Sequence, residues 1–518
     1  MVAAAFAAPM MECAMSHAIP RRNVVLGTAA LGLSALARAR VARAAEAAWS
    51  EQPAHPLAER LAAYADGLRY TDIDPATIEA VKTHVVDTMG CAIAALDEKP
   101  VGACRLVALA ASVSGTSTII GTNSRSTPEL AAFANSVAGR YYDLNDVYVV
   151  RQAGHPSDII AGCLAVAEAE RASASDLITA IALAYEVNCR LFDAFDLSER
   201  GWDGTVFTLP AAALAAGKLM KLDRQKLEQA VNIALNDHIP LGQTRAQTLS
   251  DWKGIADADA VRNGVFAAML ARAGVTGPAP VFEGKAGFFH LVSGKAVDID
   301  IERFGGRGGP GGGGNAFRIH QVGMKAFPAQ VYTQTAIIAA TALAKEAGGT
   351  DRMAAIDIAT TRRGYQMAGS EEEKWAPDTR DTADHSLPYI VARAMFDGDI
   401  TNTSYTGDKL RDPRILAFMR KIKVSEDPAL TALKSNAPPT RITVSLDDGK
   451  RISRQVGDVP GFGGRPMERP DAERKFRGNV GKRWPEQRIA SALEAMWALD
   501  RTDDVAAFLG KFATQSNL

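Results

Sequence analysis

The chain has few of the residues that build metal centres and disulfide frameworks. Its 518 residues include only five cysteines and eight histidines, and no two cysteines have the C-x-x-C spacing of a zinc site or an iron–sulfur cluster. An excess of one charge is also lacking, because 58 basic side chains are balanced by 59 acidic ones. A nucleic-acid-binding protein is typically far more basic. We therefore expect no metal, no other cofactor and no nucleic-acid partner.

The N-terminal hydrophobic run is too short to span a bilayer. It covers residues 24–37, whereas a membrane helix needs about 20 apolar residues. Arg21 and Arg22 stand just before the run, and small residues follow it at 41–44. This order resembles a twin-arginine export signal. We predict that residues 1–45 are such a signal and that the protein is periplasmic without stable membrane insertion. If the segment is not a signal, the protein is expected to be cytoplasmic.

Most of the chain has the hydrophobic spacing of helices. The length is enough for two domains or more, and the 47% hydrophobic content can supply their cores. Apolar residues recur with helical spacing up to about residue 280, and strand signals are few. Pro128, with Thr127 as N-cap, and Pro156 are each expected to open a helix. A large all-helical domain is predicted over residues 46–317.

The pattern changes after about residue 298. Residues 355–359 alternate like a strand, and residues 441–446 form a second strand pattern that ends in an Asp-Asp-Gly turn. These elements, with helices before and between them, predict a smaller α+β domain over residues 318–460. Helices in residues 461–518 are expected to return to the helical domain. The predicted fold class is therefore mostly α, with a large helical domain and a smaller α+β lid.

Two neighbouring segments concentrate polar side chains between two predicted helices. Residues 142–146 contain Tyr-Asp-Leu-Asn-Asp, and residues 154–158 contain Gly-His-Pro-Ser-Asp. Side chains at a helix end, in a loop and at the next helix start can converge on a small ligand. Taken alone, the pattern is at least as typical of carboxylates that cap helices and of a histidine bonded within a loop.

These segments resemble the signature of the MmgE/PrpD family. The likeness rests on several motifs in the family's order, from about residue 57 to the C-terminus. Further matching segments are Trp252–Gly254, Val261–Gly264, Gly274–Pro278, Lys325–Gln330, Thr382–Tyr389 and, more weakly, Pro466-Met467 and Lys475-Phe476. The resemblance implies a helical domain and a smaller lid with the active site between them. It also implies a cofactor-independent lyase acting on a small polycarboxylate, with 2-methylcitrate dehydration as the nearest named activity. A homodimer is expected.

The implied chemistry assigns roles to four residues. Removing a proton next to a carboxylate adds negative charge to an anionic group, so the site needs cations and a proton carrier. Lys253 and Lys325, each placed near a helix start, are the predicted cations. His155 is the proton carrier because histidine titrates near neutrality, and Asp143 either orients it or acts as base. The predicted substrate-binding residues are Asn145, Asp146, Ser157 and His385, and no metal ligand is predicted.

Two departures from the family pattern leave the substrate open. Val147 stands where relatives commonly carry a threonine, and Gly204 stands where dehydratase-like members tend to carry a histidine. Valine cannot hydrogen-bond a substrate. Decarboxylation and epimerisation of a related di- or tricarboxylate therefore remain alternatives. A further alternative is a non-catalytic periplasmic protein that binds polycarboxylates.

Overall fold

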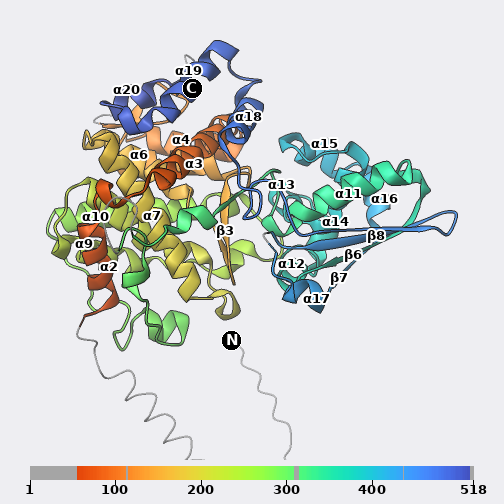
Figure 1. The fold of residues 1–518 in the computed structure, drawn as a ribbon, viewed down its shortest axis with the longest axis horizontal. Helices are drawn as coiled ribbons and strands as arrows, with labels where there is room; N and C mark the ends of the chain where they lie inside the picture. The colour runs from red at the N-terminus through yellow and green to blue at the C-terminus, as the bar shows by residue number, and fades with distance from the viewer. Residues whose placement is uncertain (1–54, 112–114, 308–313, 436, 514–518) are drawn as a thin grey trace, which may run out of the picture. The chain divides into compact units, whose positions relative to one another are not determined.

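Figure 1 shows the computed structural model, which describes residues 55–513 except 112–114, 308–313 and 436. The predicted export signal, residues 1–45, lies outside the described residues. No helix among the described residues is long and apolar enough to cross a membrane.

The first part of the chain is mostly helical, as predicted. Its α-helices are α2 (Leu57–Gly67), α3 (Pro75–Ala94), α4 (Lys99–Leu109), α5 (Pro128–Arg140), α6 (Asp158–Ala169), α7 (Ala174–Ala194), α8 (Thr208–Leu219), α9 (Arg224–Asp237) and α10 (Ala256–Arg272). Helices α7 and α8 are buried along nearly their whole length, and α10 packs against α5, α8 and α9. Gly264 allows this close approach, because a Cβ there would lie 2.6 Å from Ala212 Cβ in α8. The core therefore lies among α5, α7, α8 and α10.

Two of the predicted helix starts differ in detail from the structure. Pro128 opens α5 as expected, but the Thr127 hydroxyl donates to Glu129 at 2.7 Å instead of capping the helix. Pro156 precedes its helix by two residues. The N–H groups of Asp158 and Ile159 bond three residues back, so Pro156 lies in a tight turn and α6 begins at Asp158.

Short strands interrupt the helical part. This part is therefore mostly helical, whereas the prediction was that it is all-helical. Strands β1 (Ser117–Thr118) and β2 (Arg125–Ser126) pair with each other. Strand β3 (Asp146–Val149) pairs antiparallel with β4 (Ala153–Gly154) and with β5 (Gly323–Met324). Asp146 lies opposite Met324 in this register. The pairing brings residue 325 next to the polar segment that begins at Asp143.

The α+β region contains a four-stranded sheet. Its strands are β6 (Met353–Thr360), β7 (Ile422–Glu426), β8 (Thr440–Leu446) and β9 (Arg451–Val456), in the order β7-β6-β8-β9. The β6–β7 pair is parallel and the other two pairs are antiparallel. Helices α11 (Gln334–Ala347) and α14 (Leu387–Asp397) pack on each other and on this sheet (Figure 1). The shorter helices are α12 (Arg362–Ala368), α13 (Arg380–Ala383), α15 (Gly407–Leu410), α16 (Pro413–Met419) and α17 (Pro428–Ala432).

The C-terminal helices pack on the helical part of the chain, two of them on α3 and the third on α6. They are α18 (Arg469–Val480), α19 (Glu486–Trp497) and α20 (Val505–Gly510), and α18 and α19 both contact α3. Lys475 of α18 forms an ion pair with the buried Asp87 at 2.6 Å and donates to the carbonyl of Leu144 at 2.8 Å. The C-terminal segment thereby helps to hold the polar loop in place.

Candidate active site

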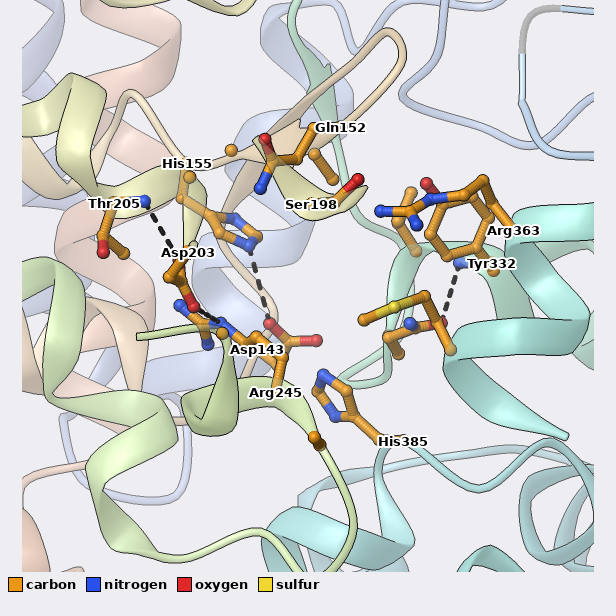
Figure 2. A pocket seen from close by; sticks show the side chains of 18 of the residues that line it. Asp143, Gln152, His155, Ser198, Asp203, Thr205, Arg245, Tyr332, Arg363 and His385 are labelled. Atoms are coloured by element: carbon orange, nitrogen blue, oxygen red, sulfur yellow. Dashed lines mark hydrogen bonds and ion pairs between the residues drawn. The ribbon is translucent and has the colours of Figure 1, made fainter. Parts of the chain in front are cut away.

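A cavity of about 210 Å³ lies where residues of the helical part and of the α+β region meet. Figure 2 shows side chains that line it, from both parts of the chain. The charged and imidazole residues among them are Arg140, Asp143, His155, Asp203, Arg245, Asp257, Lys325, Arg363, Glu371 and His385. Of the eight predicted site residues, Asp143, His155, Lys325 and His385 line the cavity. Lys253, Asn145, Asp146 and Ser157 do not.

Asp143 lies at the centre of the cluster. It follows the end of α5 in a left-handed backbone conformation, with φ of 52°, which aspartate tolerates better than most residues. Its N–H donates to the carbonyl of Arg140, and its carboxylate contacts the Arg140 guanidinium. Lys325 Nζ lies 2.8 Å from the other carboxylate oxygen and donates to the Asp143 carbonyl at 3.0 Å. A sharp turn thus places a buried carboxylate between two cations.

The surrounding charges shift the proton affinities of this pair. Burial alone would raise the pKa of Asp143, but the charges of Lys253, Lys325 and Arg140 hold it well below its usual range. Burial lowers the pKa of Lys325 to about 8, against the opposing effect of Asp143. Asp143 is therefore a carboxylate, and Lys325 is an ammonium group able to lose its proton at mildly alkaline pH.

His155 has the geometry of a proton acceptor. Its Nδ1 lies 2.6 Å from the Asp146 carbonyl, which can only accept, so Nδ1 carries the hydrogen of the neutral ring. Its Nε2 lies 3.9 Å from Asp143. Burial and the nearby charges of Arg140 and Lys325 lower the pKa of His155 well below its usual range. The ring is therefore neutral at neutral pH with Nε2 unprotonated, which suits a base.

The three predicted residues next to this site are buried and hydrogen-bonded within the protein. They are Asn145, Asp146 and Ser157. Asp146 accepts from the Ser157 N–H at 3.1 Å and from the Tyr185 hydroxyl at 2.7 Å. Asn145 donates to the Ser157 hydroxyl and to Asp158, both at 2.9 Å. In this structure these bonds fix the loop that carries His155, while the buried Asn145 Oδ1 has no hydrogen-bond partner among the described residues. Their substrate-binding role remains a prediction.

His385 is held by a second buried carboxylate. Its Nδ1 lies 2.5 Å from Asp384, whose other contacts are Lys253 Nζ at 3.0 Å and Arg380 at 3.0 Å. Burial and the charge of Lys253 lower the pKa of His385 to about 3. Lys253 is fully buried and bonded to both oxygens of Asp384. It precedes α10 as predicted, whereas Lys325 follows β5 and is not at a helix start.

Two arginines that the sequence did not single out complete the helical side of the cavity. Arg245 forms ion pairs with Asp203 at 2.8 Å and with Asp257 at 3.0 Å. Arg140 lies 3.5 Å from Asp257 in addition to its contact with Asp143. Arginine is frequent along the chain, so no local signal marks these two. The position of Arg140 three residues before Asp143 is the one spacing that points to it.

The two departures from the family pattern have local physical explanations. Val147 is 1% exposed and belongs to an apolar cluster with Val331 and Tyr332, so a hydroxyl there would be surrounded by apolar groups. A Cβ at Gly204 would lie 2.8 Å from Phe192 Cε1, so glycine leaves room for this ring. Phe192 thus takes space that a larger residue at 204 would need.

Fold and site define a mostly helical protein with an acid–base cluster of carboxylates, imidazoles and cations. The chain belongs to the MmgE/PrpD family, whose N-terminal domain matches residues 59–299 and whose C-terminal domain matches residues 327–499. The 2-methylcitrate dehydratase of Escherichia coli (strain K12) is 28% identical in an alignment 441 residues long, which covers 80% of this chain and 88% of that protein. The cis-aconitate decarboxylase of Homo sapiens is 25% identical in an alignment 468 residues long, which covers 86% of this chain and 92% of that protein.

Proposed function

We propose that this protein is a lyase that removes water from a small hydroxylated polycarboxylate, with 2-methylcitrate as the nearest named substrate. The observation that carries the proposal is the arrangement around Asp143. A neutral imidazole, His155, and an ammonium group, Lys325, lie on either side of one buried carboxylate and line the same cavity. The names of the similar proteins support the same reaction class.

The proposed step uses His155 as base and Lys325 as acid. His155 Nε2 takes the proton from the carbon next to a substrate carboxylate, and the electron pair of that C–H bond forms the carbon–carbon double bond. The neighbouring C–OH bond breaks, and its oxygen takes a proton from Lys325 Nζ and leaves as water. Asp143 stabilises the imidazolium that forms. Proton transfer from His155 back to Lys325 restores the site.

A second candidate is epimerisation, favoured by the second imidazole. In Figure 2 the Asp143 carboxylate lies between the rings of His155 and His385. Asp384 holds His385 Nδ1, so its Nε2 is also free of hydrogen in the neutral ring. Two bases on opposite sides of a carbon could remove and return a proton on different faces. Decarboxylation is supported by the name of the human relative.

The test is turnover of a panel of di- and tricarboxylates, including 2-methylcitrate, followed by proton NMR in deuterated water. The parent protein is expected to dehydrate 2-methylcitrate or a close analogue, and His155→Gln is expected to abolish this. His55→Gln is the matched control, because His55 is exposed and outside the cavity. Proton exchange without net dehydration would favour the epimerase. Binding without exchange or turnover would contradict the lyase and favour a binding protein.

We further propose that the enzyme acts in the periplasm as a homodimer. The support for export is the Arg21-Arg22 pair before the short apolar run. The support for the dimer is the family resemblance, and light scattering of the purified protein tests it.

A further inference from the structure

Arg363 differs from the other basic residues of the cavity. Four arginine and lysine side chains line it, and three of them contact carboxylates: Arg140 and Lys325 contact Asp143, and Arg245 contacts Asp203 and Asp257. Arg363 has no carboxylate partner among the described residues. Its Nε is shielded from solvent and has no hydrogen-bond acceptor there. Arg363 therefore has no ion-pair partner within the described protein.

The contacts of Arg363 keep it at the cavity. It lies on α12, which is capped by the Thr361 hydroxyl at the Gly364 N–H and which packs on the turn Val331–Thr333. Burial raises the pKa of Tyr332, and a hydrogen bond from Arg363 to its hydroxyl opposes this rise. Figure 2 shows Arg363 beside Tyr332, on the side of the cavity away from Asp203 and Thr205. The guanidinium is thus positioned by a neutral partner that leaves its charge available.

Apolar side chains line part of the cavity, together with Gln366 and Glu371 from the region of Arg363. Val331 and Met367 line the cavity from the same region of the chain, and Ala153 lines it from the loop before His155. A ligand that reaches from the Asp143 cluster to Arg363 therefore passes apolar side chains. This suits a short hydrocarbon chain with anionic groups at both ends.

We propose that Arg363 binds a carboxylate of the substrate remote from the carbon that reacts at His155, and that it thereby selects polycarboxylates over monocarboxylates. A guanidinium presents two parallel N–H groups that match the two oxygens of a carboxylate. This proposal deepens the proposed function, because it rests on a polycarboxylate that reacts at the Asp143 cluster. Arg363 is a specificity-determining residue in this arrangement.

The experiment measures binding and does not depend on turnover. Tricarballylate, which lacks the hydroxyl that dehydration removes, and butyrate, which has a single carboxylate, are titrated by NMR into the parent protein and into Arg363→Gln. Arg363→Gln is expected to weaken tricarballylate binding about ten- to a hundredfold, the range for one charged hydrogen-bonded contact. Butyrate binding is expected to change less than about twofold, because its carboxylate occupies the cationic cluster.

Arg362→Gln is the matched control. Arg362 is the exposed neighbour on the same helix and does not line the cavity, so neither ligand is expected to bind differently. Arg363→Lys keeps the charge but loses the paired N–H groups, and it is expected to fall between the parent and Arg363→Gln. Circular dichroism confirms that each variant is folded.

The outcomes separate this inference from the proposed function. Unchanged tricarballylate binding in Arg363→Gln, equal weakening for butyrate, or no tricarballylate binding by the parent protein would overturn the role of Arg363. Arg363-dependent binding in a parent protein that turns over no substrate would sustain Arg363 and contradict the lyase. Turnover of a substrate by the parent, together with unchanged tricarballylate binding in Arg363→Gln, would support the lyase and overturn the role of Arg363.

Discussion

Lys325→Met keeps an unbranched side chain of nearly the same length and removes the ammonium group that contacts Asp143 at 2.8 Å. We expect the variant to bind substrate more weakly and to turn it over more slowly, because one charged contact and the proposed acid are lost together. A contact of this kind is worth about 2 to 4 kcal/mol, which is about a 30- to 900-fold loss in kcat/KM. Lys82→Met is the control, since Lys82 is also buried and ion-paired, to Asp500 at 3.2 Å, but does not line the cavity.

The pH dependence gives the same prediction a second measurement. The step needs a protonated Lys325, whose pKa is lowered to about 8. Activity of the parent is therefore expected to fall about tenfold for each pH unit above that value. It also needs a neutral His155, whose pKa is held well below its usual range, so activity is expected to persist below pH 6.5. In Lys325→Met the alkaline decrease is expected to disappear.

The assay is the initial rate of dehydration from pH 5 to pH 10, with the fold of each variant checked by circular dichroism. Loss of one partner leaves Asp143 with fewer cations, so some loss of stability is expected. A folded Lys325→Met variant with the same kcat/KM as the parent would show that Lys325 takes no part in binding or catalysis. A variant that is slower but keeps the alkaline decrease would assign that decrease to another group and refute the role of Lys325 as acid.

Three further outcomes are expected. Activity should survive treatment with a chelator, because no metal-ligand spacing of cysteine and histidine occurs in the sequence; loss that one divalent ion restores would contradict this. Gly204→Ala should lower the free energy of unfolding by about 1 to 3 kcal/mol, measured by urea denaturation, because its Cβ would meet Phe192 at 2.8 Å; an unchanged midpoint would show that the ring moves freely. A fusion of residues 1–48 to a reporter should reach the periplasm, and the double substitution Arg21→Lys with Arg22→Lys should block its export. A parent fusion that stays in the cytoplasm would contradict the prediction that this segment is an export signal.

Local chemistry explains where several of the elements begin. The Asp74-Pro75 pair begins α3 with Asp74 accepting from the Thr77 N–H, and Ser173 caps α7 in the same way. The alternation in β8 predicts a strand because its buried positions recur every second residue. The short strands β1 to β5 were not predicted, nor was β7. It is five residues long and pairs parallel to β6, and such a pair has no hairpin turn to mark it.

The predictions for the site depended on residue type, and their limits follow from this. His155 and Asp143 stand out because an imidazole and carboxylates cluster within a short segment. Arg140, Arg245 and Arg363 do not stand out, because arginine usually lies on solvated surfaces and only burial against a cavity distinguishes these three. The contacts that shift the pKa of His155 come from residues distant in sequence, such as Lys325, so the direction of that shift could not be read locally.

By itself, the sequence determined the helical and strand-forming segments, the polar cluster and the family, because these depend on local spacing and on the order of motifs. Only the tertiary structure decided the environment of each charge. Lys253 and Lys325 have the same side chain and were predicted to have the same role. Lys253 is enclosed with Asp384, whereas the pairing of β5 with β3 carries Lys325 to the cavity beside Asp143. Their difference arises because burial and neighbouring charge, which set the behaviour of an ammonium group, are properties of packing.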